Sequence, residues 1–503
     1  MNISVKYALN SLHISRKRRK IMNNMEEIIS DIWKDVLKND SIGLDDNFFD
    51  VGGTSMKAIE IIEKCKKSGI IIPIYKMFTC QTIREISAVA EFSENKYRDA
   101  DLLMNVIGKI NGFTPDENYI KILDEYEKKC RNISYRVSDE PKNILVTGAT
   151  GYIACHIIEK ILTESSSHIY AVVRGKDEKS AAERFWNLTD FYFPNSSYRE
   201  IYADRISFLT GDLTKDYFGL PEKKYLELSE IIDSVLHTAA NINHYGKWEE
   251  FEKLNINGTK RVIEFVKTGC EKVLNHVSTI STCHTYKRSE NPIPFTEYDT
   301  LLDEDAENYY VRSKLISENL VVSEKGNFRF RIFRPSNIIQ SYRYGKYPFG
   351  TTKENLHLVN TELSILNILE KDEIFPDLDK KLLDFSYVDE TAEAIYRLMG
   401  IEEDDCFIYH VYNPNMMTIS EYADFIGKNK IPLDKIRDVF IEKYDSISYD
   451  LKQLCTLSIA EGNVNQALIM SPENLRTVRL LGRLGFEWHK LESKNISDIL
   501  NFR

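Results

Sequence analysis

From Asn143 onward, the sequence alternates between short apolar runs and longer amphipathic stretches. Apolar runs of this length, separated by segments of helical periodicity, predict buried strands joined by helices. The predicted strands are Ile144–Val146, Ile169–Val173, Ile206–Leu209, Ser234–His237, Lys272–Val277 and Phe328–Phe333. This alternation indicates an α/β fold with a doubly wound, Rossmann-type parallel sheet. After Pro335 it weakens, and we expect a smaller, mainly helical substrate lobe mostly within residues 335–503, with helices over 419–426 and 476–484.

A glycine-containing turn follows the first predicted strand. The segment TGATGYIA, residues 147–154, lies between that strand and a predicted helix. Gly148 permits a tight turn, and Gly151 lets the backbone approach the pyrophosphate of a dinucleotide. Ala154 replaces the third glycine of the usual pattern and still keeps helix and strand close. A bare glycine motif is weak evidence, but the surrounding strands and helix favour a dinucleotide site.

The end of the second predicted strand distinguishes between the two nicotinamide cofactors. NAD-binding proteins usually place an acidic residue there, roughly 20 residues past the glycines. This chain has Arg174, followed by Lys176, Lys179 and Arg184. A cation suits the 2'-phosphate of NADPH, which an acid would repel. We therefore predict NADPH; the alternative is that Arg174 is only a solvated surface residue.

Further cofactor contacts are expected where later strands end. Asp212 and Leu213 follow the third strand, where related folds contact the adenine, and Ala239 follows the fourth strand with a side chain small enough to pass beneath the cofactor. The predicted cofactor-binding residues are Thr147, Gly148, Thr150, Gly151, Tyr152, Ile153, Arg174, Arg184, Asp212, Leu213, Ala239 and Lys314.

Tyr310 and Lys314 form a Tyr-x-x-x-Lys pair, whose spacing places both side chains on one helix face. A phenol has a pKa near ~10, and an ammonium beside it lowers that pKa toward neutrality. The lysine can also hold the nicotinamide ribose. Thr279, in the segment NHVSTIS that ends the fifth strand, can present a hydroxyl to the carbonyl that Tyr310 addresses. We predict Thr279, Tyr310 and Lys314 as the catalytic residues.

Other nearby residues are weaker candidates. An isolated Tyr-x-x-x-Lys is common by chance, but its order after a glycine turn and a strand-end Ser-Thr favours an active site. Tyr309 competes with Tyr310, yet its partner four residues on is Ser313. His276 and His284 are better explained as core or surface residues. Cys283 has no evident basic partner and is interpreted as structural.

A small helical domain is predicted over residues 25–92. Apolar residues recur at helical spacing over 28–37, further helical patterns begin at Ser55 and cover 74–78 and 83–90, and Gly52-Gly53-Thr54 precedes Ser55. A serine at a helix N-terminus after two glycines is accessible, and the helix dipole tolerates a phosphodiester there. Taken alone, the pattern favours an ordinary helix cap.

Composition and charge narrow the class of protein. The net charge of −11 argues against nucleic acid as the main partner. The eight cysteines form no CxxC pair or metal-spaced cluster, which predicts reduced thiols in a cytoplasmic protein and no metal site. No run of ~18 apolar residues is present, so no membrane span is expected.

Two further segments complete the predicted domain organisation. Residues 1–24 carry basic residues and no acid, and we interpret them as a disordered extension, with a targeting arm or docking segment as the alternative. Residues 93–139 are charged and helix-prone, which predicts a helical connector. The large domain is predicted over 140–503.

The string DNFFDVGGTSMKAI resembles the attachment motif of peptidyl carrier domains, in which aromatic residues precede Gly-Gly-x-Ser and an apolar helix follows. The resemblance covers residues 26–92. It implies that Ser55 carries a covalent 4'-phosphopantetheine arm and that a phosphopantetheinyl transferase is a partner.

The large domain resembles the extended short-chain dehydrogenase/reductase family, and more narrowly the thioester reductase domains that terminate nonribosomal peptide assembly lines. The segments VTGATGYIA, VVRG, GDLTKDYFGL, HTAANINHY, NINGTKRVIEF, NHVSTIS and YYVRSKLISENL carry the resemblance, which is weakest after residue 340. One departure is Ser336, where the family usually has glycine. The family's adenylation domain is absent from this chain.

This resemblance implies NADPH-dependent reduction of a carrier-bound peptidyl or aminoacyl thioester. Hydride addition would give a hemithioacetal that collapses to an aldehyde, and a second hydride transfer would give an alcohol. The upstream synthetase proteins, with adenylation and condensation domains, would select and load the cargo.

Three alternatives stay open at this point. Related release domains cyclise the chain without redox chemistry, but they typically lack the tyrosine. A generic extended short-chain reductase or a nucleotide-sugar epimerase shares the fold, but needs no carrier domain. A non-catalytic docking platform for a carrier would not need Thr279, Tyr310 and Lys314.

Overall fold

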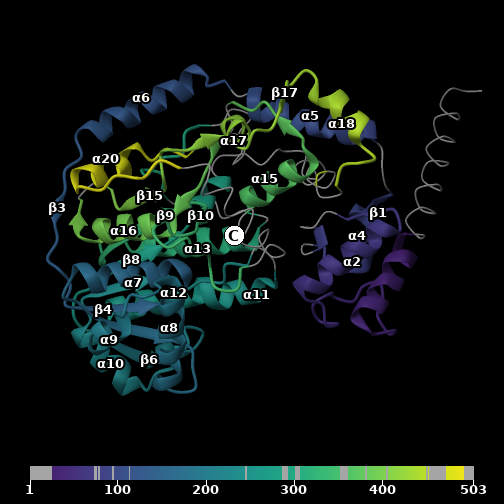
Figure 1. Cartoon of the computed structure of the whole chain (residues 1–503). Coiled ribbons are helices and arrows are strands. Elements are labelled where there is room, and N and C mark those ends of the chain that lie inside the picture. The colour runs from purple at the N-terminus through teal and green to yellow at the C-terminus, as the bar shows by residue number, and fades with distance from the viewer. Residues whose placement is uncertain are drawn as a thin grey trace, which may run out of the picture. The chain divides into compact units, whose positions relative to one another are not determined.

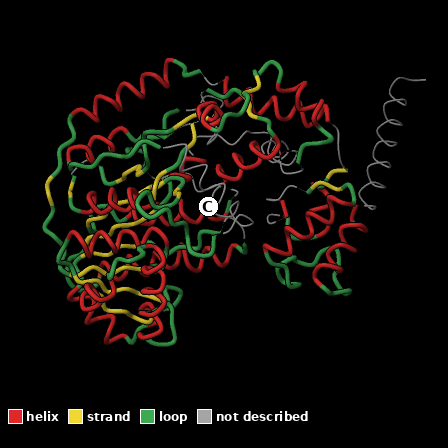
Figure 2. Tube along the Cα trace, in the orientation of Figure 1, coloured by secondary structure: helices red, strands yellow, loops and turns green. Residues whose placement is uncertain are grey.

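The computed structural model describes residues 25–72, 76–77, 80–92, 96–112, 114–243, 246–285, 293–300, 306, 308–351, 361–379, 382–403, 406–448, 451 and 472–491 (Figure 2). The basic segment 1–24 lies outside them. The chain divides into two compact units. Unit 1 comprises Met1–Ile107, Tyr245–Lys247 and Asp434–Val464, and unit 2 comprises Gly108–His244, Trp248–Leu433 and Asn465–Arg503.

The N-terminal part of unit 1 is a small helical domain. Residues 25–37 are helical, and α2 (Ser55–Lys67) and α4 (Ile83–Val89) follow, with a short antiparallel pair of β1 (Ile70–Ile71) and β2 (Glu91–Phe92). The apolar faces of these helices meet in one core around Trp33 and Phe48, whose rings lie 5.0 Å apart. The predicted helix over 74–78 lies mostly outside the described residues.

A seven-stranded sheet forms the centre of unit 2 (Figure 1). Its strands are β4 (Asn143–Thr147), β5 (His168–Val173), β6 (Ile206–Thr210), β7 (Ser234–His237), β8 (Val273–Val277), β9 (Arg329–Pro335) and β15 (Ile408–Val411). The order is β15-β9-β8-β7-β4-β5-β6, and all neighbours are parallel. The predicted doubly wound parallel sheet is therefore confirmed, with the change in winding direction between β4 and β7.

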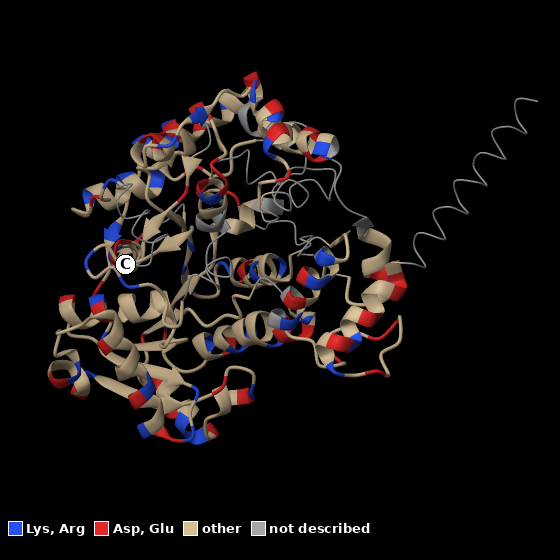
Figure 3. Cartoon of the chain, turned by 45° about the vertical axis from the view of Figure 1, so that its right-hand side comes forward, with Lys and Arg blue, Asp and Glu red and all other residues tan. Residues whose placement is uncertain are grey.

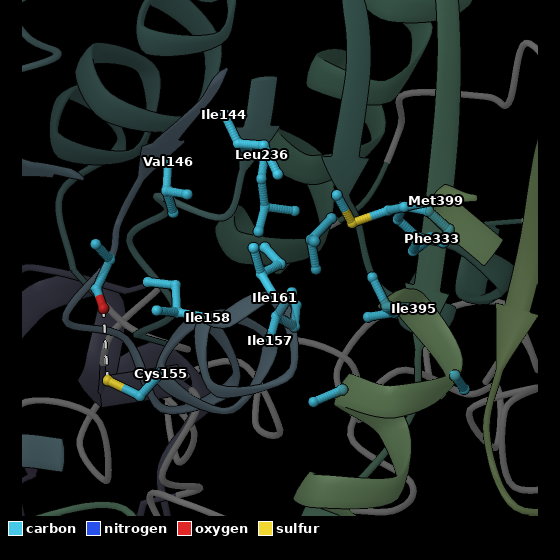
Figure 4. Packing of buried hydrophobic residues seen from close by; sticks show 14 of the residues in the cluster. Ile144, Val146, Cys155, Ile157, Ile158, Ile161, Leu236, Phe333, Ile395 and Met399 are labelled. Atoms are coloured by element: carbon cyan, nitrogen blue, oxygen red, sulfur yellow. Dashed lines mark hydrogen bonds between the residues drawn. The ribbon is translucent and has the colours of Figure 1, made fainter. Parts of the chain in front are cut away.

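Helices cover both faces of the sheet, because successive side chains of a strand point to opposite faces. Ile144 and Val146 of β4 belong to one core, and Leu145 belongs to the other. The first face is covered by α7 (Tyr152–Glu164), α8 (Glu178–Tyr192), α16 (Val388–Met399) and α20 (Leu475–Arg483), and the second by α10 (Glu222–Ile231), α12 (Asn257–Lys267) and α13 (Tyr309–Ser323). Figure 4 shows Ile157 and Ile161 of α7 facing Ile395 and Met399 of α16.

The C-terminal third is shared between the sheet domain and a separate lobe. Strand β15 and helices α16 and α20 belong to the sheet domain, although the sequence pattern did not predict β15. The lobe contains α15 (Thr361–Asp372), α17 (Ile419–Phe425) and three strand pairs that were also not predicted. These pairs are β10 (Ile338–Ile339) with β13 (Ser386–Tyr387), β11 (Phe375–Pro376) with β17 (Lys430–Ile431), and β12 (Leu382–Leu383) with β16 (Met417–Thr418). Helix α18 (Ile436–Lys443) belongs to unit 1.

The segment predicted as a connector has two helices with different surroundings. Helix α5 (Lys96–Gly112) crosses the boundary between the units, whereas α6 (Glu117–Arg131) belongs to unit 2. The Tyr126 hydroxyl of α6 donates to the buried Glu297 carboxylate at 2.6 Å. Strand β3 (Arg136–Val137) then pairs with β14 (Ile401–Glu402). Residues 117–137 are thus part of the fold of unit 2.

The remaining short elements connect the main ones. They are α9 (Tyr198–Tyr202), α11 (Trp248–Phe251), 3₁₀ turns over Ala203–Arg205, Asp216–Gly219 and Ile280–Thr285, and a π-helical turn over Glu252–Ile256.

Charged residues are interspersed over the surface helices (Figure 3). Among the residues that the structure describes, no helix combines the length and apolar character needed to cross a membrane.

Candidate active site

The turn after β4 is built for close approach of a ligand to the backbone. Gly148 has a φ of +75°, and a Cβ there would lie 2.7 Å from the backbone nitrogen of Ala239. Gly151 caps α7 without a side chain, so the helix N-terminus is open to an anion. Because a side chain at Gly148 would clash with the neighbouring strand end, the turn can only be built with glycine. This geometry fits a dinucleotide.

Four further predicted cofactor residues lie at the same edge of the sheet, since the carboxyl ends of parallel strands meet there. Exposed Arg174 follows β5, half-buried Asp212 and buried Leu213 follow β6, and half-buried Ala239 follows β7. Burial alone would raise the pKa of Asp212, but hydrogen bonds from Thr214 and the nearby charges of Lys215 and Arg174 lower it. An ionised Asp212 beside Arg174 can accept from ligand hydroxyl or amino groups.

The side chains of Tyr152, Ile153 and Arg184 have surroundings other than those expected for cofactor contacts. The Tyr152 hydroxyl donates to the carbonyls of Ile339 (3.1 Å) and Lys346 (2.6 Å) and is therefore occupied within the protein. Ile153 packs against the apolar core. Both remain placed to offer a ligand their backbone at the start of α7. Arg184 lies on the exposed face of α8, and Thr150 is half-buried in the glycine turn.

The three predicted catalytic residues come together around the start of α13. Asn308 caps this helix by accepting from the Val311 N–H at 3.1 Å, which places Tyr310 in the first turn. Thr279, just after β8, is hydrogen-bonded to the Tyr310 hydroxyl. Lys314, one turn further along, donates from Nζ to the Val277 carbonyl at 2.7 Å. Two hydroxyls and an ammonium thus converge beside the end of β8.

Burial changes the acidity of both titratable groups. It lowers the pKa of Lys314 to about 8, against an opposing effect of Glu318. It raises the pKa of Tyr310, and the hydrogen bond from Thr279 only partly offsets this. The lowered phenol pKa predicted from the sequence is wrong in direction, because desolvation of Tyr310 outweighs the hydrogen bond from Thr279. A raised pKa keeps Tyr310 protonated at neutral pH, as a proton donor requires.

The weaker candidates lie close to this cluster, in surroundings that favour a structural role. Tyr309 packs beside Trp248, with ring centres 5.6 Å apart. Burial raises the pKa of the Cys283 thiol to about 12 and keeps the pKa of His276 well below its usual value. The side chain of His284 lies outside the described residues.

One buried residue beside the site was missed by sequence reasoning. Asn255 lies in the π-helical turn between α11 and α12 and is 2% exposed. Its side-chain amide donates to the Ser313 hydroxyl at 2.8 Å and to the Asn241 carbonyl at 3.0 Å. π-Helical turns are often found at functional sites. Only the structure reveals this turn, because the surrounding sequence reads as one ordinary helix.

The small domain of unit 1 presents a second candidate site. Gly52 has a φ of +95°, and a Cβ on Gly53 would lie 2.5 Å from the carbonyl oxygen of Phe48. Both glycines are therefore needed for the turn that precedes α2. Ser55 is the first residue of that helix, and its side chain lies outside the described part. The backbone geometry is that of an open helix N-terminus after a tight turn.

Comparison with known families matches both regions. Residues 27–90 match the family described as phosphopantetheine attachment site, and residues 146–395 match the NAD-binding family described as male sterility protein.

Individual relatives match the same regions. The chain is 28% identical to the L-2-aminoadipate reductase of Schizosaccharomyces pombe over 59% of this chain and 22% of that protein. It is 22% identical to one protein of the linear gramicidin synthase of Brevibacillus parabrevis, over 93% of this chain and 9% of that protein. The chain thus spans only about a fifth or less of the length of these relatives.

A solved structure shares the fold. A thiolation-reductase di-domain from an archaeal nonribosomal peptide synthetase is 22% identical, covers 95% of this chain and 97% of its own, and has a TM-score of 0.70.

Proposed function

Because residues 27–90 form a phosphopantetheine-attachment domain and residues 146–395 belong to the male sterility protein family of NAD-binding domains, we propose that this chain is the terminal carrier-reductase of a nonribosomal peptide assembly line. It reduces a peptidyl or aminoacyl thioester on Ser55 with NADPH and releases an aldehyde. The observation that carries the proposal is the cluster of Thr279, Tyr310 and Lys314 in a chain that also contains a phosphopantetheine-attachment domain.

The residues around the start of α13 have different roles in the proposed reduction. NADPH, when bound, supplies the hydride. Thr279 and Tyr310 donate hydrogen bonds to the thioester carbonyl oxygen, where negative charge develops. The Tyr310 hydroxyl, kept protonated by burial, then passes its proton to that oxygen. As the hemithioacetal collapses, its O–H proton returns to Tyr310 and the carbon–sulfur bond breaks. The aldehyde carbonyl forms, and the sulfur of the arm takes a proton from solvent and leaves as the thiol.

Lys314 and the edge residues hold the cofactor in this scheme. Lys314 donates to the nicotinamide ribose, the turn at Gly148 and the start of α7 receive the pyrophosphate, and Arg174 pairs with the 2'-phosphate. The cation at Arg174 is the reason to assign NADPH over NADH.

Replacing Arg174 with alanine is expected to weaken NADPH binding about 10- to 100-fold, because charge-assisted hydrogen bonds to the 2'-phosphate are lost. NADH binding should stay within about twofold of wild type, because NADH has no phosphate at this position. Fluorescence titration of both cofactors measures the change. Arg199→Ala, which removes a surface arginine paired with Glu183, is the control. Equal losses for both cofactors would contradict the assignment.

The pH dependence of the reduction should reflect Lys314. Its ammonium form dominates below its pKa of about 8, and the neutral form dominates above it. We therefore expect kcat/KM to be constant near neutrality and to fall as pH rises through 8, approaching about tenfold for each further pH unit. Lys314→Arg, which stays protonated, should lack this decline even if its overall rate is lower. A decline that persists in the arginine variant would assign the titration to another group.

The proposal also names partners and location. Upstream adenylation and condensation proteins supply the cargo, a phosphopantetheinyl transferase installs the arm, and the reaction takes place in the cytoplasm. Tethering raises the effective concentration of the thioester, so the reductase needs little intrinsic affinity for the peptide.

The direct test uses the full chain loaded by a phosphopantetheinyl transferase with an aminoacyl-coenzyme A. Addition of NADPH should release the aminoaldehyde, with one NADPH oxidised per carrier and the bare thiol left on Ser55, as read by absorbance and intact mass spectrometry. Release of a cyclised or hydrolysed product without NADPH oxidation would contradict the reductase assignment. If no cargo leaves the carrier, a docking platform is the better description.

A further inference from the structure

A continuous chain of buried hydrogen bonds joins the glycine turn to the catalytic helix. Thr147, the last residue of β4, bonds through Oγ1 to Nδ1 of His237, the last residue of β7, at 2.7 Å. His237 Nε2 bonds to Thr259 Oγ1 of α12 at 3.0 Å. Thr147, His237 and Thr259 are each at most 1% exposed. One imidazole therefore bridges the strand before the cofactor turn and the helix that follows the π-helical turn.

The chain continues to the backbone of Tyr310. The Thr259 hydroxyl donates to the Asn255 carbonyl at 2.6 Å, and the Asn255 amide donates to the Ser313 hydroxyl at 2.8 Å. Ser313 Oγ then donates to the Tyr310 carbonyl at 2.8 Å. The last link lies in the first turn of α13, so the network ends on the catalytic residue itself.

The tautomer of His237 follows by elimination. The Thr259 hydroxyl proton is used toward Asn255, so Thr259 Oγ1 must accept from Nε2–H of His237. Nδ1 then carries no proton and accepts from the Thr147 hydroxyl. Every proton points from Thr147 toward Tyr310, and the bonds that share the His237 imidazole and the Thr259 hydroxyl strengthen one another.

The surroundings of His237 favour this neutral form. Burial, together with the charge of Lys314 on α13, lowers the pKa of His237 to about 3. The ring of His276 on β8 lies beside it, with centres 5.2 Å apart, and the pKa of His276 is likewise well below its usual value. A charged imidazole would carry a proton on Nδ1 as well, and the bond with Thr147 would reverse, with the threonine hydroxyl accepting.

We propose that His237 is a positioning residue whose neutral Nε2–H imidazole holds the cofactor turn and the catalytic helix in register. It acts through Thr147 on the cofactor side and through Thr259, Asn255 and Ser313 on the catalytic side. The inference rests on the proposed function for the identity of cofactor and substrate.

Two conservative substitutions separate the two sides of the imidazole. His237→Asn keeps an acceptor near the Nδ1 position and loses the donor toward Thr259. His237→Gln keeps a donor near the Nε2 position and loses the acceptor for Thr147. With a soluble acyl-pantetheine thioester as substrate, we expect His237→Asn to lower kcat about tenfold with an unchanged NADPH dissociation constant. His237→Gln should raise that dissociation constant about tenfold with little change in kcat.

His276→Leu is the control, since it removes the neighbouring ring and leaves every residue of the hydrogen-bond chain in place. It should change neither kcat nor the NADPH dissociation constant selectively. The melting temperatures of the two His237 variants should be similar, because each loses one buried hydrogen bond. Parallel changes of kcat and NADPH affinity in both variants would reduce His237 to a structural residue and overturn the proposal.

A second readout does not depend on activity. Nitrogen-15 NMR of histidine-labelled full chain, with the His237 signal assigned by its absence in His237→Gln, should show the proton on Nε2 and no titration from mildly acidic to mildly alkaline pH. A proton on Nδ1 would overturn the inference. Failure of the wild type to bind NADPH or reduce the thioester would instead remove the proposed function, while the NMR result still stands.

Discussion

Tyr310→Phe is expected to abolish NADPH-dependent release of cargo while leaving phosphopantetheine attached to Ser55. The substitution removes one hydroxyl, which is the proposed proton donor and one of two donors to the developing oxyanion. Loss of general acid catalysis alone costs about 10²- to 10⁴-fold in rate, and loss of an oxyanion donor adds to this. Single-turnover NADPH oxidation by loaded protein measures the effect.

The chain supplies a matched control for this experiment. Tyr309→Phe removes a hydroxyl one residue away, on a side chain that packs beside Trp248 and Phe251. It should turn over at close to the wild-type rate. NADPH affinity should be unchanged in Tyr310→Phe, because Lys314 and the glycine turn are untouched. Full turnover by Tyr310→Phe would mean that another group delivers the proton, and the assignment of Thr279 as its partner would fail with it.

The second large effect is expected at the carrier. Ser55→Ala should gain no mass when incubated with coenzyme A and a phosphopantetheinyl transferase, and should release no tethered cargo. The serine oxygen is the proposed attachment point, so no arm forms without it. The same variant should still reduce a soluble acyl-pantetheine thioester at the wild-type rate, because its reductase residues are intact. Intact mass spectrometry measures attachment of the arm, and NADPH oxidation measures reduction of the soluble thioester.

Thr54→Asn is the corresponding control. It removes the neighbouring hydroxyl. The Lys57 N–H donates to Thr54 Oγ1 at 3.3 Å, and the asparagine side chain supplies an acceptor in its place. This variant should gain the arm normally. Attachment to Ser55→Ala, or its loss in Thr54→Asn alone, would move the attachment site off Ser55 and remove the physical link between the carrier and the reduction.

The buried hydrogen-bond chain bears on both experiments. Because Ser313 Oγ donates to the Tyr310 carbonyl, the proposed network links the position of the Tyr310 phenol to residues outside the proposed catalytic cluster. Substitutions of Thr259 or Asn255 should therefore lower kcat and leave phosphopantetheine attachment unchanged. Carrier loading depends on α2 and its preceding turn, which belong to the other unit.

Several features of this protein were readable from local sequence. The strands from Ile144 to Phe333 could be predicted to within two residues because buried parallel strands need continuous apolar runs. The glycine turn could be predicted because only glycine tolerates the positive φ that it needs. The spacing of Tyr310 and Lys314 is one helical turn, so their shared face also follows from the sequence. Their catalytic role, like that of Thr279, stays a prediction until the variants are measured.

Other features were decided by tertiary structure, because they depend on which segments become neighbours. Strand β15 is short and lies far along the chain, and only its pairing with β9 identifies it as part of the sheet. Helix α6 looks like a linker until Tyr126 reaches Glu297, which is 171 residues away. The raised pKa of Tyr310 and the neutral state of His237 arise from burial. The local pattern determined the six predicted strands, the glycine turn and the spacing of Tyr310 and Lys314. Long-range packing decided the place of β15 and α6 and the acidity of the buried groups, because these depend on distant parts of the chain.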